Sequence, residues 1–230
     1  IQDGDNDTNG ISIGADALAL NSSTIRDAAL NDADLTHDAW SDNYTYIVDT
    51  TPPTVSSVAI TSAPFSSAPS SLGLQNSFLN ADDRVEETVT FNEVYPSAVI
   101  VSGNPTLTLD VGGTNRTAAY HSDNNTTPSS KNDNATLVFE YTIKETGTLG
   151  ENDPNGISIV ANALNSNSIT IMDRAGNIAT NSDLANSRVQ DNPNYKVDTT
   201  PPSVVSFTMD DIEIKTNETA SVTLVFSERV

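Results

Sequence analysis

Apolar and polar residues alternate along several short stretches of the chain. The sequence is TLTLDV at 106–111 and TLVFEYTI at 136–143. A period of two places the apolar side chains on one face of a β-strand, so both stretches are predicted to be half-buried strands. Similar patterns predict further strands at 55–61, 85–92, 116–121, 157–159, 168–172 and 195–197. The stretch 161–164 also allows a short helical turn.

Turn-forming residues separate these predicted strands. Clusters of Gly, Asn, Asp, Ser and Pro lie between them, which favours short strands joined by tight connections. Only 36 % of the residues are hydrophobic and 6 % are aromatic, so the core must be thin and mostly aliphatic. Low hydrophobicity with high net charge also suits a disordered chain, but the regular alternation argues against disorder. The sequence therefore predicts an all-β, antiparallel β-sandwich.

The sequence also repeats itself. Three pairs of blocks match in the same order: 48–53 with 197–202, 9–31 with 155–177, and 88–94 with 223–229. Matches of this kind indicate a tandem repeat.

The repeat boundary is best placed at the Thr-Thr-Pro-Pro step. Paired prolines cannot donate to a β-ladder and they stiffen the chain, so this step suits a connector. Residues 50–198 are then one complete repeat. Residues 1–49 are predicted to be the C-terminal part of a preceding repeat, and residues 199–230 the N-terminal part of a following one.

Several motifs mark the complete repeat. It opens with DTTPP at 49–53, continues with FNE at 91–93 and VSGNPTLTLDVG at 101–112, and carries DRAGN at 173–177. In these motifs the chain resembles the Ig-like repeats of giant bacterial surface adhesins and biofilm-associated proteins. The resemblance implies Ig-like β-sandwich repeats in tandem, located outside the cell on a bacterial surface. It further implies a structural role as a spacer or stalk segment of a large adhesin.

One position departs from the repeat. Leu30 stands where the later copy has Gly176. A leucine opposes the positive φ that a tight left-handed turn requires, which argues against the same turn in the first copy.

Charge and composition exclude several function classes. With 31 acidic and 10 basic residues, the net charge is −21. Such a chain repels phosphates and anionic membrane surfaces, so we expect no nucleic-acid partner and no membrane insertion. The sequence has no cysteine, its two histidines, His37 and His121, do not recur between the copies, and no nucleophile or metalloprotease motif occurs. We therefore expect no enzyme activity. The paired acids, Asp82 with Asp83 and Glu86 with Glu87, are interpreted as solvated faces and as possible ligands at the pole opposite Asp49.

Strand directions predict where the remaining acids meet. The first strand runs away from Asp49 and the second returns, which brings Glu93 to the same pole as Asp49. A later strand that ends near residue 172 leaves Asp173 and Asn177 at this pole as well. Ca²⁺ takes carboxylate and amide oxygens as ligands, so a calcium site is predicted at the junction between repeats. Its partners would be neighbouring repeats of the same chain, with self-association as a further option.

The same argument extends to the other junction and to the first copy. Asp198 and Glu228 should face Glu151 and Asp153 across the second junction. In the first copy, the loop 5–9 with Asp5 and Asp7 should face Asp49 and Glu93 across the first junction, and Asp27 is a further candidate ligand.

Other interpretations stay open for these residues. Asp49 and Asp198 can cap the turn into the prolines, and Asp173 with Asn177 can form an Asx turn. For the whole chain, the alternative is a subunit of an extracellular filament that assembles by strand exchange between Ig-like domains. An accessory module of a secreted polysaccharide-degrading enzyme is a further option.

Overall fold

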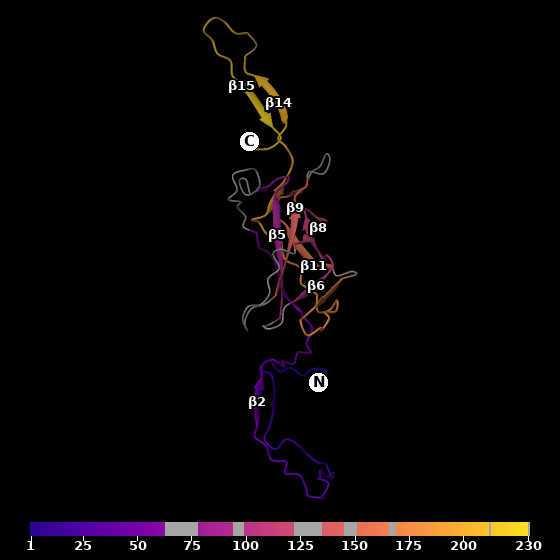
Figure 1. Ribbon diagram of the computed structural model, residues 1–230. Coiled ribbons are helices and arrows are strands. Elements are labelled where there is room, and N and C mark those ends of the chain that lie inside the picture. Colours follow the sequence, from indigo (N-terminus) through magenta and orange to yellow (C-terminus); the bar gives the residue numbers. More distant parts are fainter. Residues whose placement is uncertain are drawn as a thin grey trace.

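The computed structural model describes residues 1–62, 78–93, 99–121, 135–144, 151–165, 169–211 and 213–229. These residues form β-strands and turns and contain no helix, which confirms the all-β prediction. Three portions of the chain follow one another along one axis in Figure 1. They are an N-terminal segment (1–48), a central portion (50–198) and a C-terminal hairpin.

The strands are short, as the turn pattern predicts. In the N-terminal segment they are β1 (Ile11–Ile13) and β2 (Trp40–Asn43), and in the C-terminal hairpin β14 (Val204–Met209) and β15 (Val222–Phe226). The central strands are β3 (Val55–Ile60), β4 (Phe78–Leu79), β5 (Arg84–Phe91), β6 (Ile100–Ser102), β7 (Thr106–Val111), β8 (Thr114–Tyr120), β9 (Thr136–Thr142), β10 (Asn152–Asp153), β11 (Ser158–Asn165), β12 (Thr170–Met172) and β13 (Lys196–Asp198).

A six-stranded antiparallel sheet forms one layer of the central portion. Its strand order is β11-β7-β8-β9-β5-β3. Alternate residues of its strands point into the core: on β5 and β9, for example, Val89 pairs with Leu137 and both are fully buried. The alternation in the sequence thus translates directly into one buried face.

Smaller sheets close the core from the other side. One pairs β12 with β6, and the other has the order β10-β13-β4. Ile171, Leu79 and Val197 of these sheets belong to the same hydrophobic cluster as the six-stranded sheet. This arrangement is consistent with a β-sandwich. Most pairings are antiparallel, but β13 and β4 run parallel.

The described residues of the terminal portions form no such core. Ile11 and Ile13 of β1 are 45 % and 52 % exposed, whereas the matching residues of the later copy, Ile157 and Ile159, are fully buried. In the C-terminal hairpin, Phe207 is likewise 64 % exposed. The hydrophobic core therefore lies in the central portion.

The prediction of a helical turn at 161–164 was wrong. The stretch 161–164 is part of strand β11 and not a helical turn. Leu164 pairs with Leu107 of β7, and the amides of Asn162 and Ala163 donate to the backbone carbonyl and the side chain of Asn186. An irregularity in that pairing and a positive φ of 53° at Asn162 take up the extra residues. The predicted strand at 168–172 appears as β12, and Ser168 lies outside the described residues.

The left-handed turn forms in both copies despite Leu30. Its φ is 69°, compared with 94° for Gly176. The amide of Leu30 donates to the carbonyl of Asp27, as the amide of Gly176 donates to that of Asp173. The Asp27 carboxylate also accepts bonds from the backbone and side chain of Asn31, at 2.9 Å each. These bonds hold the leucine in a conformation that costs roughly 1–2 kcal/mol.

Candidate metal centre

Three carboxylates converge at one pole of the central portion. Asp49 lies in the connector before β3, Glu93 follows β5, and Asp173 follows β12 directly. One oxygen from each carboxylate lies within 4.8 Å of the other two. Segments far apart in the sequence thus form one acidic triad, which can hold a metal ion.

Asp173 is the most firmly positioned member of the triad. It is fully buried, and its Oδ1 accepts hydrogen bonds from the amides of Gly176 at 2.7 Å and Asn177 at 2.9 Å. Its Oδ2 accepts a bond from Asn177 Nδ2 at 2.7 Å. Asp173 therefore belongs both to an Asx turn and to the acidic triad, and the turn holds its carboxylate in place.

Asn177 links this turn to the connector. Its Nδ2 also donates to the backbone carbonyl of Asp49 at 3.0 Å. The side chain predicted as a ligand thereby positions two members of the triad, Asp173 through its carboxylate and Asp49 through its backbone.

Burial and mutual repulsion shape the electrostatics of the triad. Glu93 is 4 % exposed, and its pKa is raised to about 7, first by burial and then by the negative charges of Asp173 and Asp49. Bringing carboxylates together out of water is unfavourable unless a proton or a cation compensates their charge. A divalent cation between them would offset the repulsion that raises this pKa.

Glu151 and Asp153 make contacts of a different kind. Glu151 Oε1 accepts a hydrogen bond from the Tyr141 hydroxyl at 2.5 Å and lies 2.6 Å from Arg116 Nε. Asp153 accepts bonds from the amides of Gly156 at 2.9 Å and Gly112 at 2.8 Å. Both carboxylates are satisfied within the protein. Arg116 could not be recognised as the partner of Glu151 from the sequence, because the pair joins segments distant in the chain.

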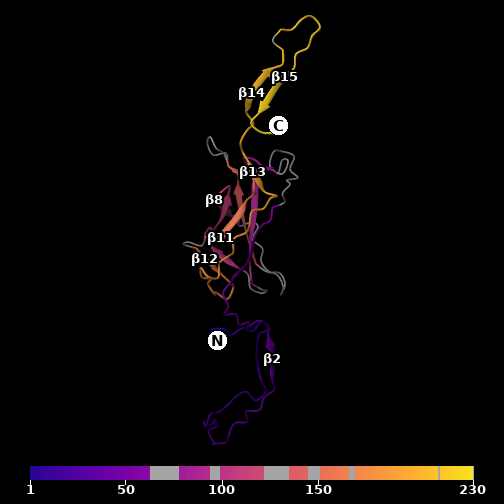
Figure 2. The same ribbon diagram turned by 180° about the vertical axis from the view of Figure 1, so that it is seen from behind.

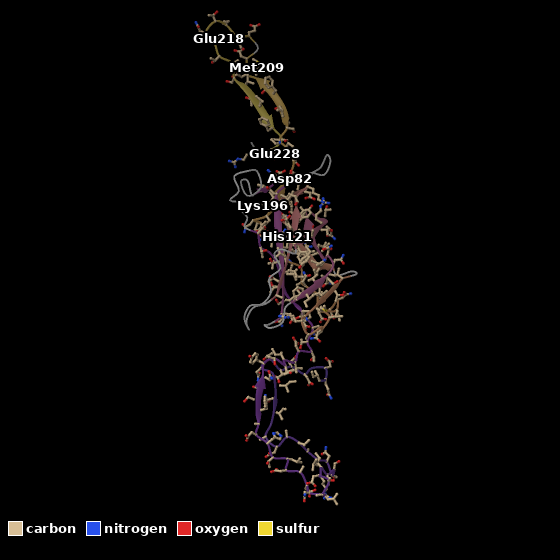
Figure 3. The ribbon with its side chains drawn as sticks, in the orientation of Figure 1. Asp82, His121, Lys196, Met209, Glu218 and Glu228 are labelled. Carbon is tan, nitrogen blue, oxygen red and sulfur yellow. The ribbon has the colours of Figure 1, made fainter. Side chains whose placement is uncertain are left out.

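The second junction gathers Asp198 and Glu228 around one pocket, together with Asn152 and Phe78. Figure 3 shows Glu228 where the C-terminal hairpin meets the central portion. Asp198 Oδ1 accepts the amide of Thr200 at 3.0 Å, and Asp49 Oδ1 accepts that of Thr51 at the same distance. Within the described part of the chain, no third acid joins this pair as Asp173 joins the first.

The remaining candidate ligands lie in the N-terminal segment. Asp27 repeats the loop geometry of Asp173 but is exposed, and hydrogen bonds from the side chain and then the backbone of Asn31 lower its pKa. Asp7 Oδ1 accepts the amide of Gly10 at 2.9 Å, and Asp5 Oδ2 accepts that of Gln2 at 2.7 Å. The described residues contain one cluster of three acids, the triad of Asp49, Glu93 and Asp173.

Comparisons with known proteins add no relative. No family model, no curated protein and no solved structure matches the chain. In the described ranges, no helix has the length and apolar character needed to cross a membrane.

Proposed function

We propose that the chain is a structural spacer segment of a large extracellular bacterial surface protein, built from tandem Ig-like repeats whose junctions calcium stiffens. The acidic triad carries this proposal. Asp49 belongs to the connector, whereas Glu93 and Asp173 belong to loops of the central portion. A cation bound to all three would tie the connector to the sandwich and limit bending between them.

Calcium suits the donor set better than other common metals. The triad offers only carboxylate oxygens, the ligands of hard cations, while zinc sites favour nitrogen and sulfur. Mg²⁺ demands near-ideal octahedral geometry and keeps several waters, whereas Ca²⁺ accepts roughly 6–8 oxygens in flexible arrangements. Extracellular calcium modules work at dissociation constants of about 10⁻⁴–10⁻³ M, so a site outside the cell needs no high affinity.

The organisation of the chain supports a spacer. The N-terminal segment and the C-terminal hairpin lie at opposite ends of the central portion in both views (Figures 1 and 2). The chain thus enters the central portion at one pole and leaves it at the other. Repetition of such a unit gives a linear array, which is the shape a stalk requires.

Thermal unfolding of the full chain in calcium and in excess chelator tests the proposal. A ligand that binds only the folded state stabilises it by about 2.7 kcal/mol at a hundredfold excess over its Kd. We expect the melting temperature to rise by roughly 5–10 °C, at about 2–4 °C per kcal/mol. Small-angle scattering should then show a narrower range of overall dimensions in calcium than in chelator.

A matched pair of variants assigns the effect. Asp173→Asn and Asp27→Asn alter the same loop in the two copies, but only Asp173 belongs to the triad. The first variant should abolish the calcium-dependent rise, and the second should leave it intact. Coincident melting curves in calcium and chelator for the unmodified chain would rule out the calcium-stiffened spacer.

A further inference from the structure

Three side-chain hydrogen bonds hold the second connector where it leaves the central portion. The amide of Thr199 donates to Asn152 Oδ1 at 3.0 Å, and Asn152 Nδ2 donates to Thr200 Oγ1 at 2.8 Å. The hydroxyl of Thr199 donates to the carbonyl of Glu151 at 3.0 Å. One asparagine thus holds both threonines of the connector.

The first connector has the same three bonds. The amide of Thr50 donates to Asn6 Oδ1 at 3.2 Å, Asn6 Nδ2 donates to Thr51 Oγ1 at 3.0 Å, and the hydroxyl of Thr50 donates to the carbonyl of Asp5 at 3.0 Å. The two copies of the repeat therefore form one arrangement, here called the asparagine clasp: Asn6 with Thr50 and Thr51, and Asn152 with Thr199 and Thr200.

The clasp acts on the two threonines of each connector, between two other backbone restraints. Before the threonines, a short ladder fixes the backbone through the pairs Asp7 with Val48 and Asp153 with Val197. After them, the paired prolines each fix their own φ. Between these restraints, the amide of the second threonine donates to the preceding aspartate at 3.0 Å in each connector, and the clasp adds bonds to both threonines.

The clasp and the acidic triad hold the first connector from different sides. Asn6 belongs to the N-terminal segment and bonds Thr51, whose amide donates to Asp49 Oδ1. Asn177 belongs to the central portion and bonds the carbonyl of Asp49. The clasp contains no acid side chain, so its bonds form without a cation.

We propose that Asn6 and Asn152 are positioning residues that set the direction in which each connector leaves the preceding portion, independently of any metal ion. The purpose of this device rests on the proposed spacer function, but its mechanism does not. Calcium would then stiffen a junction whose orientation the clasp has already fixed.

Distances between spin labels test the clasp in the full chain. The sequence has no cysteine, so introduced cysteines are labelled without background. Exposed positions suit this purpose: Thr117→Cys with Ser221→Cys spans the second junction, and Ser41→Cys with Thr117→Cys spans the first. Distance distributions are measured in excess chelator, so that no cation contributes.

We expect Asn152→Ala to widen the distribution across the second junction at least twofold and to leave the first unchanged. Asn6→Ala should do the reverse, so each variant controls for the other. Thr200→Val, which removes one bond of the clasp and keeps the side chain's shape, should give an intermediate width. Both asparagines are exposed, and an unchanged melting temperature will show that the core is intact.

The outcomes separate the clasp from the spacer function. Widths that neither alanine variant changes would overturn the clasp. If the distance distribution across the first junction is narrow in chelator and Asn6→Ala widens it, the clasp is supported irrespective of the effect of calcium. If calcium then fails to narrow the distribution of the Asn6→Ala chain, the calcium-stiffened spacer fails while the clasp stands.

Discussion

Replacing Glu87 by leucine should stabilise the protein. Glu87 lies on β5 between Val85 and Val89, points into the core and is fully buried, and neither of its carboxylate oxygens has a hydrogen-bond partner. It pairs with Phe139 of β9 and Ile60 of β3. The later copy carries a valine, Val222, at the matching position, directly before the block that begins with Thr223.

The expected gain follows from the missing partners. A buried polar group without a hydrogen bond costs about 1–3 kcal/mol, and leucine fills a similar volume without polar atoms. Glu87→Leu should therefore raise the free energy of unfolding at neutral pH by about 1–3 kcal/mol. The melting temperature should rise by roughly 2–4 °C per kcal/mol.

The same carboxyl predicts a pH dependence. Burial, and then the negative charges of Glu86 and Glu140, raise the pKa of Glu87 well above its ordinary value of 4.5. Above pH 4.5 the unfolded chain loses this proton while the folded chain keeps it, so stability falls as pH rises until the folded carboxyl ionises as well. Both Glu87→Leu and Glu87→Gln should remove this part of the decline.

Urea unfolding in chelator between about pH 5 and 9 measures the effect. The experiment is best made in a Glu93→Gln background, because Glu93 also has a raised pKa. Glu87→Gln serves as the control, since it keeps the shape and polarity of the side chain and loses only the ionisation. If Glu87→Leu destabilised the chain at neutral pH, or left the slope against pH unchanged, the reasoning would be refuted.

Three further predictions concern other parts of the central portion. Calorimetry should show that calcium binds about tenfold more weakly at pH 6 than at pH 8, because the pKa of Glu93 is about 7 and its carboxyl group must lose the proton to bind the ion. Equal affinities at the two pH values would count against Glu93 as a ligand. Arg116→Met should lower the free energy of unfolding in urea by about 3 kcal/mol, because it leaves the buried carboxylate of Glu151 without its charged partner. A loss of stability below about 1 kcal/mol would show that the ion pair contributes little. Gly176→Ala should lower the free energy of unfolding by about 1–2 kcal/mol because of the positive φ at this position. Gly156→Ala should lower it clearly more, because the new Cβ would lie 1.9 Å from a backbone oxygen. Equal losses of stability in the two variants would contradict this close approach.

Local patterns predicted much of the fold. The strict alternation at 136–143 specified β9, and the repeat anticipated that Asp27 and Asp173 occupy matching loops. Strand direction sufficed to bring Asp49, Glu93 and Asp173 to one pole, because antiparallel neighbours return the chain to its starting side.

Two features were not predicted from the sequence. The pairing of Glu151 with Arg116 depends on a long-range contact, and the burial of Glu87 follows from an alternation that was overlooked. The interpretation of Glu87 as part of a solvated face was wrong, although the buried neighbours two residues away on either side point it inward. That interpretation gave more weight to the polarity of the glutamate side chain than to its position in the alternation. Glu151 was predicted to be a metal ligand from its place at the junction. Its ion-pair partner Arg116 lies on β8, and no local pattern reveals such a pair.

The edge strand β3 determines how the protein carries tension. The first connector leads into β3 at one pole, and β13, labelled in Figure 2, lies at the other pole next to the C-terminal hairpin. A pull on the two chain ends therefore acts along β3 and shears it against β5. The pairs from Val55 with Phe91 to Ile60 with Glu87 are loaded together and cannot open one after another. Mechanical failure then requires the simultaneous loss of this ladder, which favours resistance to stretching over easy unzipping.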